Sequence, residues 1–501
     1  MADFPDNPAL NDKVVHNNVT YTFNGQAWDG VAPTPVVSSV NPSFITIQAD
    51  VSSGISSART TANNPGTVTV NLDDTGVTAG NYNTADITVD AQGRVSKARS
   101  RTEMKSIYSV YDGDWAAAFN VAGENGGAWW IPSGTYDIDR QIIIRENGTK
   151  FIGDESDKPK LRFNFTGGLA QANGITSNNG FGLWAAAKFR VRGVAFQWKQ
   201  AVIPQNINAA LLLFQKGDTG DNSSRADMDS SIENCNFTAA RHNFNCLGAA
   251  YITYYGRNMR VTDCTFSSKG NRVDGADHIR AIALSYAPNA DDDDDGQTLA
   301  TGGHRKNYVS GNTFHMTSKS ICVEAFMTSN VGVGVLAGLM ITSNMNDIGG
   351  TLLRVNEGVY ADSTVITGNS CIRSKKTPYV EVLSGGRLRN STITGNSFGN
   401  IDARDDNYAD GITLHEGGQM RDVTITGNAF GAPQNACIKL DGTYARVVIT
   451  GNIFDKLHGP GNVAVAAGSA DNKAVLVANS TDNLTLTSGT TGKWQIANNI
   501  V

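Results

Sequence analysis

The chain has 501 residues, of which 18% are charged and 53 are glycine, and its formal net charge is -6. This length exceeds one ordinary compact core, and a composition rich in glycine and poor in charge favours turn-rich β-structure, so we expect several domains or a repeat array. The small and interspersed charge excludes an electrostatic footprint for nucleic acid, and the apolar runs are too short to predict membrane insertion. The first residues have no basic start or apolar core of a signal peptide, so we expect synthesis in a cytoplasm.

The N-terminal part contains two short alternating segments. Residues 13–30 alternate around Asn24-Gly25, a strong hairpin signal, so residues 1–32 are predicted to form a small β-module. A proline-spaced linker follows, and proline-rich spacers are semi-rigid. Further alternation around Gln92-Gly93 predicts a short β-repeat, so residues 33–103 are interpreted as linker and β-repeat.

A short N-capped helix is predicted in the stretch 112–119, because an aspartate can accept hydrogen bonds from the free amides that begin a helix and the alanines that follow propagate it. Beyond it, a five-residue corner motif recurs along the chain at spacings that suit a solenoid, with loops of variable length between copies. Its clearest copies carry Thr-Gly-Asn, in which glycine permits a left-handed turn, asparagines stack as a ladder and phenylalanine returns inward. The asparagine positions of these copies are Asn369, Asn396, Asn428 and Asn452.

Three stretches resemble known families. ITVDAQGRV at 87–95 resembles repeats of phage tail-fibre proteins, and VTYTFNGQAW at 19–28 resembles an N-terminal motif of phage fibres. The helix, IPSGTY at 131–136 and FIGD at 151–154 together resemble the beginning of the pectate-lyase superfamily fold, which phage tailspikes share.

These resemblances imply an all-β chain with a right-handed parallel β-helix at 104–456. They also imply attachment through residues 1–32 to a phage tail, baseplate or adaptor protein, and a place in the virion tail. Residues 457–501 differ in sequence pattern from the preceding coils. They are predicted to form terminal coils or a trimerisation segment, with strands that could intertwine in a homotrimer.

A second strand follows most corners and alternates between inward and outward residues. The inward positions are predicted to be Ile321, Val323, Leu353, Val355, Val380, Val382, Ile412, Leu414, Ile438 and Leu440. The outward positions, predicted to form an exposed polar column, are Cys322, Glu324, Arg354, Asn356, Glu381, Leu383, Thr413, His415, Lys439 and Asp441.

This column supplies candidate catalytic residues. Glycoside hydrolysis uses two carboxyl groups roughly 5 to 9.5 Å apart, and coils stack about 4.8 Å apart, so Glu324 and Glu381, two rungs apart, would be separated by about 10 Å. Glu357, and His415 with Glu416, are alternative members. A solvated strand face without chemistry is the other interpretation.

Acidic loops and cysteines suggest no cofactor. Asp274, Asp277 and His278 lie in a glycine-containing loop, where turn formation is the ordinary role. The run Asp291–Asp295 could bind Ca²⁺ but lacks the spacing of an EF-hand, so a solvated loop is favoured and no metal site is predicted. The six cysteines have no CxxC spacing and are interpreted as buried free thiols.

Aromatic residues suited to stacking on sugar rings gather around the early coils, although such residues are often core or subunit interface. We expect a glycan contact zone near residues 240–310, and the candidate glycan-binding residues are Trp198, Tyr251, Tyr254, Tyr255 and Tyr286.

Three functions are compatible with this sequence. The first is a homotrimeric tail fibre or tailspike that adsorbs to a host surface polysaccharide without cleaving it. The second is a tailspike depolymerase, a glycoside hydrolase or a lyase, acting on that polysaccharide. The third is a bacterial polysaccharide lyase or surface protein, against which the fibre-like N-terminus argues. Fold alone does not decide between the first two.

Overall fold

The computed structural model describes residues 5–16, 19–31, 55–57, 70–72, 85–89, 95–100, 104–164, 181–198, 210–215, 229–239, 250–255, 258–268, 279–285, 306–316, 320–326, 334–347, 350–372, 377–399, 410–431, 436–455, 463–467, 473–477, 479–481, 486–487 and 494–497. The chain divides into two compact units, Met1–Arg101 and Thr102–Val501. Within the described residues, no helix is long and apolar enough to cross a bilayer.

The first unit consists of antiparallel strand pairs. β1 (Lys13–His16), β2 (Val19–Phe23) and β3 (Trp28–Val31) form one sheet, and Asn24 Oδ1 accepts from the Ala27 amide at 2.8 Å in the turn between β2 and β3. This confirms the predicted turn. The remaining pairs are β4 (Ile55–Ser57) with β5 (Val70–Leu72), and β6 (Ala85–Val89) with β7 (Val95–Ser100). Gln92 and Gly93 lie outside the described residues.

The second unit is built from three long parallel sheets, as the described residues define them. Sheet I has twelve strands: β10 (Thr135–Ile138), β13 (Lys160–Phe163), β16 (Ala195–Trp198), β19 (Asn236–Ala239), β22 (Thr265–Ser268), β25 (Thr313–His315), β29 (Met345–Asn346), β33 (Ser370–Ile372), β36 (Ser397–Gly399), β39 (Ala429–Gly431), β42 (Ile453–Asp455) and β45 (Ser480–Thr481). Sheet II also has twelve: β11 (Ile142–Ile144), β14 (Phe181–Ala185), β17 (Ala210–Gln215), β20 (Ala250–Tyr255), β23 (Arg280–Ser285), β26 (Ile321–Phe326), β30 (Thr351–Val355), β34 (Val380–Val382), β37 (Ile412–Leu414), β40 (Ala436–Leu440), β43 (Val463–Ala467) and β46 (Leu486–Thr487).

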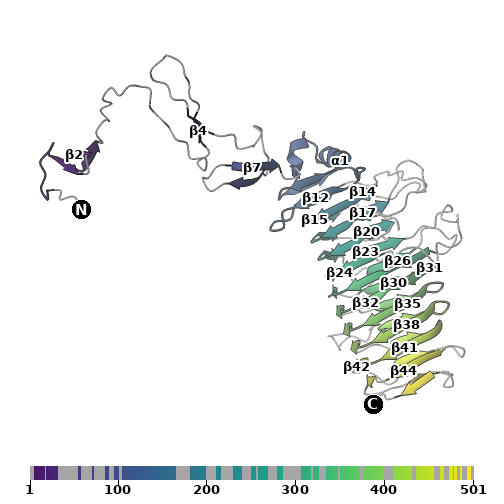
Figure 1. The fold of residues 1–501 in the computed structure, drawn as a ribbon. Coiled ribbons are helices and arrows are strands. Elements are labelled where there is room, and N and C mark those ends of the chain that lie inside the picture. The colour runs from purple at the N-terminus through teal and green to yellow at the C-terminus, as the bar shows by residue number, and fades with distance from the viewer. Residues whose placement is uncertain are drawn as a thin grey trace. The chain divides into compact units, whose positions relative to one another are not determined.

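Sheet III has sixteen strands within the same described residues: β8 (Met104–Ser106), β9 (Ala128–Ile131), β12 (Thr149–Gly153), β15 (Phe189–Arg192), β18 (Ser231–Glu233), β21 (Arg260–Thr262), β24 (Asn307–Ser310), β27 (Gly334–Ala337), β28 (Leu339–Thr342), β31 (Val359–Asp362), β32 (Val365–Thr367), β35 (Arg387–Thr394), β38 (Gln419–Thr426), β41 (Thr443–Thr450), β44 (Lys473–Val477) and β47 (Trp494–Ala497). Each coil adds a strand to sheets III, I and II in turn, and successive coils lie side by side (Figure 1). The predicted right-handed parallel β-helix is confirmed. The described strands of residues 457–501 extend the same three sheets within one chain.

The corner between sheets III and I holds the predicted asparagine ladder. Gly368, Gly395, Gly427 and Gly451 have φ angles of 62–63°, the left-handed conformation that glycine adopts without steric cost. The ladder comprises Asn312, Asn344, Asn369, Asn396, Asn428, Asn452 and Asn479, all at most 2% exposed. In each pair of neighbours, the backbone amide and the Nδ2 amide of one residue both donate to Oδ1 of the next, at 2.9–3.0 Å.

Cysteines continue this ladder toward the N-terminal coils. The Cys264 amide donates to Asn312 Oδ1 at 2.9 Å, and the Cys235 amide donates to Cys264 Sγ at 3.4 Å. Burial raises the pKa of the Cys264 thiol. The five described cysteines are free and buried, as predicted, while Cys246 lies outside the described residues.

Aromatic rings fill the interior beside the ladder. Phe196, Phe237, Phe266 and Phe314 stack in sheet I with neighbouring centroids 4.8–5.3 Å apart, and Phe398, Phe430 and Phe454 form a second stack. These inward phenylalanines confirm the role predicted for the last residue of the corner motif. Their contacts supply apolar burial at every rung they occupy.

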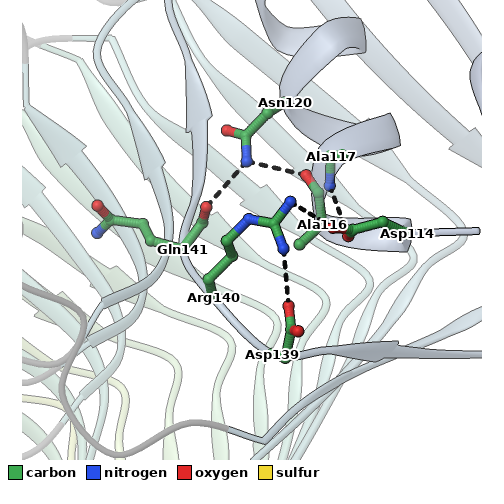
Figure 2. A network of polar contacts seen from close by, with 7 residues as sticks. All are labelled: Asp114, Ala116, Ala117, Asn120, Asp139, Arg140 and Gln141. Atoms are coloured by element: carbon green, nitrogen blue, oxygen red, sulfur yellow. Dashed lines mark hydrogen bonds and ion pairs between the residues drawn. The ribbon is translucent and has the colours of Figure 1, made fainter.

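The first coil is covered by α1 (Trp115–Asn125), which follows the 3-10 helix η2 (Ile107–Val110). Asp114 caps α1, because its Oδ1 accepts from the Ala117 amide at 2.9 Å (Figure 2). That hydrogen bond, opposed by slight burial and assisted by Arg140, lowers the pKa of Asp114. Asn120 Nδ2 donates to the Gln141 carbonyl at 3.0 Å and ties α1 to the coil, so the predicted helix closes this end of the interior.

Replacing one ladder residue should be costly. Asn396→Ala would remove the acceptor of two Asn369 donors and leave them buried, so we expect the free energy of unfolding to fall by about 3 kcal/mol. Thermal and denaturant unfolding, followed by circular dichroism, would measure this loss. Thr394→Ala, on the outer face of the same coil, is the matched control and should change stability little. Equal effects of the two substitutions would contradict a stabilising ladder.

Candidate functional site

The predicted polar column lies on the outer side of sheet II. Glu324 pairs in register with Arg354, Arg354 with Glu381, and Glu381 with Thr413. The prediction that this column is solvent-exposed is wrong, because Glu324, Arg354 and Glu381 are only 5%, 9% and 6% exposed. The column therefore consists of nearly buried charges, which require partners.

A second correction concerns Cys322. It was expected to face outward between Ile321 and Val323, yet Cys322 and Val323 both belong to the interior cluster. The same holds for the corresponding pairs Leu352–Leu353, Tyr379–Val380 and Cys437–Ile438. Sheet II strands thus contribute two consecutive inward residues before alternation begins, and a strict two-residue period misplaces the first of them.

Glu324 is held by two donors. Its Oε2 accepts from Arg280 Nη1 at 2.8 Å, and its Oε1 accepts from Asn356 Nδ2 at 2.9 Å. The guanidinium of Arg280 also lies 4.8 Å from the ring centroid of Phe326. Arg280 is a site residue that sequence reasoning missed, because it begins β23 and reaches Glu324 only across a coil boundary.

Glu381 is also held by two partners. Its Oε2 accepts from Arg354 Nε at 2.7 Å, and its Oε1 lies 2.9 Å from His415 Nε2. Burial raises the pKa of Glu381, but the His415 hydrogen bond and the charge of Arg354 outweigh it and lower the pKa below its ordinary value. Because an ionised carboxylate only accepts, Nε2 carries the proton of the His415 bond.

The column holds nearly buried charges of both signs on the outer side of sheet II. Arg354 occupies the rung between the two glutamates, so the carboxylates are about 10 Å apart by rung spacing. Glu381 is ionised at neutral pH, whereas a general acid for glycoside hydrolysis needs a raised pKa. His415 has 43% of its side chain exposed, and with the proton on Nε2 its Nδ1 can accept a hydrogen bond from a ligand.

Glu357 and Glu416 lie outside this column. Both are exposed and sit in turns between sheets II and III, where the Gly358 amide donates to the Gly385 carbonyl at 3.2 Å. Gly385 in turn donates to the Gly417 carbonyl at 3.0 Å, so these turns are stacked. The structure therefore places the two carboxylates along a neighbouring corner, with His415 as the link between turn and column.

The predicted glycan-stacking aromatics are mostly interior. Trp198, Tyr251 and Tyr254 are 4%, 1% and 1% exposed, and Tyr251 Oη donates to the Ser267 carbonyl at 2.7 Å. These three rings pack inside the coils and offer no free face to a sugar, which corrects their predicted role. Tyr255 lies in β20, but its side chain is outside the described part, as is Tyr286 altogether.

The acidic loops give no site among the described residues. Asp274, Asp277, His278 and the run Asp291–Asp295 lie outside them. Asp263 is described and occupies a corner with φ of 56°, a backbone role. Within the described ranges, no group of three or more His, Cys, Asp or Glu side chains could hold a metal ion.

Glu381 should make stability depend on pH. Its lowered pKa means that its stabilising contribution is present above the ordinary glutamate value and is lost as the pH falls through the lower folded-state value. At pH 7, Glu381→Gln would leave Arg354 and His415 without their anion, so we expect a loss of about 3 kcal/mol.

The difference between the unfolding temperatures of wild type and variant, measured from pH 7 down to pH 3, should narrow toward the acid end. The exposed pair Glu155–Arg192, 2.7 Å apart, gives the control Glu155→Gln, whose effect should be small throughout. A constant difference across the pH range would contradict the assignment of charge to Glu381.

No family model and no curated protein matches the sequence. Solved structures similar to this chain include PfbA, a surface adhesin of Streptococcus pneumoniae, with 12% identity, coverage of 79% of this chain and 89% of that one, and a TM-score of 0.46. A double mutant of the tailspike protein of E. coli bacteriophage HK620 has 12% identity, coverage of 81% and 80%, and a TM-score of 0.38. The A-module of an Azotobacter vinelandii mannuronan C-5 epimerase has 11% identity, coverage of 79% and 98%, and a TM-score of 0.40.

Proposed function

We propose that this chain is a phage tail protein of the tailspike type, which binds a surface polysaccharide of the host bacterium without cleaving it. The observation that carries the choice of binding over cleavage is Glu381, an ionised carboxylate clamped by Arg354 and His415. A clamped anion on a rigid sheet is a recognition group, since its donors and acceptors are oriented before a ligand arrives.

The column suits a hydroxyl-rich ligand. A sugar hydroxyl both donates and accepts, and hydrogen bonds to charged groups are stronger than those between neutral groups. His415 connects the buried pair to the surface at the end of β37, beside the exposed turn that carries Glu416. A glycan lying across the sheet II edge would meet this histidine first.

Depolymerisation is the second candidate function. An ionised glutamate beside a partly exposed histidine could serve as a base, with the histidine as proton carrier. The pairing at 2.9 Å between Glu381 and His415 is the observation that favours it. This candidate requires an acid on the opposite side of the scissile bond, a role for which we propose the exposed Glu357 or Glu416 of the neighbouring turns.

Attachment to the virion is assigned to the N-terminal unit. The hairpin of β2 and β3 carries the segment that resembles an N-terminal motif of phage fibres, and the hairpin of β6 and β7 carries the segment that resembles their repeats. We propose that this unit binds a tail, baseplate or adaptor protein and that the β-helix carries the polysaccharide-binding function.

Self-association into a homotrimer is proposed for a charge-free strip along the asparagine corner. The strip has no Asp, Glu, Lys or Arg over five successive coils, and it exposes Met345 and Ile453, which are 41% and 54% accessible. Exposed apolar side chains on a surface without charge favour contact with another protein surface. The strip comprises residues 339–346, 365–372, 391–399, 423–431 and 447–454.

Binding and cleavage can be separated on an array of bacterial capsular and lipopolysaccharide glycans. We expect the full chain to bind at least one glycan and to release no new reducing ends from it. His415→Ala should weaken this binding by about tenfold, the equivalent of one hydrogen bond. Arg162→Gln, on sheet I, is the control and should bind normally. New reducing ends that disappear in Glu381→Gln would establish the depolymerase instead.

The trimer is tested by light scattering coupled to gel filtration. The wild-type chain should have the mass of three copies, and Ser397→Arg should reduce it toward one copy, because an uncompensated charge would be buried at the strip. Thr443→Arg adds the same charge to an exposed position at the opposite end of a sheet III strand and should leave the mass unchanged. A monomeric wild type would contradict this proposal.

A further inference from the structure

The outer face of sheet III contains a hollow of about 460 Å³ that is separate from the sheet II column. Its charged and aromatic lining residues are Arg190, Asp229, Glu233, Arg260, Lys306 and Tyr308. This volume falls within the range of about 300–1,000 Å³ that is usual for small-ligand sites.

The hollow arises from side-chain size along one register. Arg190 pairs with Ser231, Ser231 with Arg260, and Arg260 with Tyr308 on the four consecutive strands β15, β18, β21 and β24. The small Ser231, 8% exposed, therefore forms a floor between two arginines that are about 10 Å apart by rung spacing. Because all four positions are on regular strands, the arrangement is rigid.

The electrostatics of the hollow are those of an anion site. Arg190, Arg260 and Lys306 are exposed, and none of the three forms an ion pair within the part of the chain that the structure describes. Asp229 pairs with Lys188 at 3.5 Å, outside the lining, which offsets its charge. Three cations therefore face the single unpaired carboxylate of Glu233.

The position of Arg260 is fixed by Tyr308. The guanidinium carbon lies 5.3 Å from the ring centroid, a cation–π contact that holds the planar group over the ring. An arginine fixed in this way loses less conformational freedom when it pairs with a carboxylate through two parallel hydrogen bonds. The carboxylates of Glu233 and Asp229 are suited to accept from the neighbouring hydroxyls of a sugar ring.

We propose that this hollow binds a carboxylate-bearing sugar of the host polysaccharide, a uronic acid residue. The proposal rests on the polysaccharide-binding function above and adds to it the charge class of the glycan. A neutral polysaccharide would leave three cations without a partner, whereas a uronate supplies one anion together with hydroxyls for the two acceptors.

Sodium glucuronate, glucose and inorganic phosphate are the probes, used with the full chain in saturation-transfer NMR. We expect transfer to glucuronate and little to glucose. Arg260→Gln and Lys306→Gln should each weaken glucuronate binding by about tenfold. Arg421→Gln, an exposed arginine on the same sheet several coils away, is the matched control. The substituted side chains are all exposed, so the fold should persist in each variant.

Three outcomes would overturn the assignment: equal transfer to glucose and glucuronate, unchanged binding in Arg260→Gln and Lys306→Gln, or complete displacement of glucuronate by equimolar phosphate. The last would show a general anion site. The glycan array distinguishes failure of the underlying function. If the chain binds only uncharged polysaccharides, the proposed function stands and this inference fails. If the chain shows transfer to glucuronate but binds no polysaccharide, the hollow is an anion site and the proposed polysaccharide-binding function fails.

Discussion

The asparagine ladder is the constraint on which the β-helix depends. Each buried amide satisfies its neighbour and a backbone carbonyl of the preceding coil, for example Asn396 Nδ2 with Ile366 O at 3.0 Å. A buried amide without these partners would be costly, so the register of every coil is fixed by the one beside it. The ladder therefore sets the register of the coils from Asn312 to Asn479, which carry Glu324, Glu381 and His415 of the sheet II column. The hollow of sheet III lies mainly on earlier coils, where Cys235 and Cys264 stand in place of asparagine.

The register between coils brings residues that are distant in the sequence together into one site. The ion pairs of Glu324 and Glu381 connect strands that are adjacent only because coils stack, and the same is true of Arg190, Ser231 and Arg260. The two sites differ in their charge balance. In the sheet II column each glutamate has a cation beside it, so the column can recognise hydroxyls. In the sheet III hollow the cations exceed their partners, so the hollow can recognise an anion.

The sequence predicted the features that depend on local backbone conformation and on single buried positions. A left-handed corner needs glycine, and a buried ladder position needs asparagine, so Thr-Gly-Asn identifies the coils. Burial of Glu324 and Glu381 depends on neighbouring coils, which a strand period does not reveal. Cys322 was predicted to face outward, but two successive residues of its strand face inward. Tyr251 was predicted to be exposed, because the sequence pattern of a strand does not distinguish an interior aromatic residue from an exposed one. The hollow depends on a serine between two arginines from three coils, a pattern visible only after the coils are aligned.

The ladder also runs in a single direction, since each asparagine from Asn344 to Asn452 donates to the next ladder residue and accepts from the one before. Whole coils can therefore be gained, lost or exchanged during evolution without disturbing this bonding pattern, provided that each new coil brings its own asparagine. The segments between corners are free to change length, and the interval between ladder residues already varies between 24 and 32 residues among the neighbouring pairs from Asn312 to Asn479. Such an architecture lets loops and surface strands change while the asparagine corner stays constant.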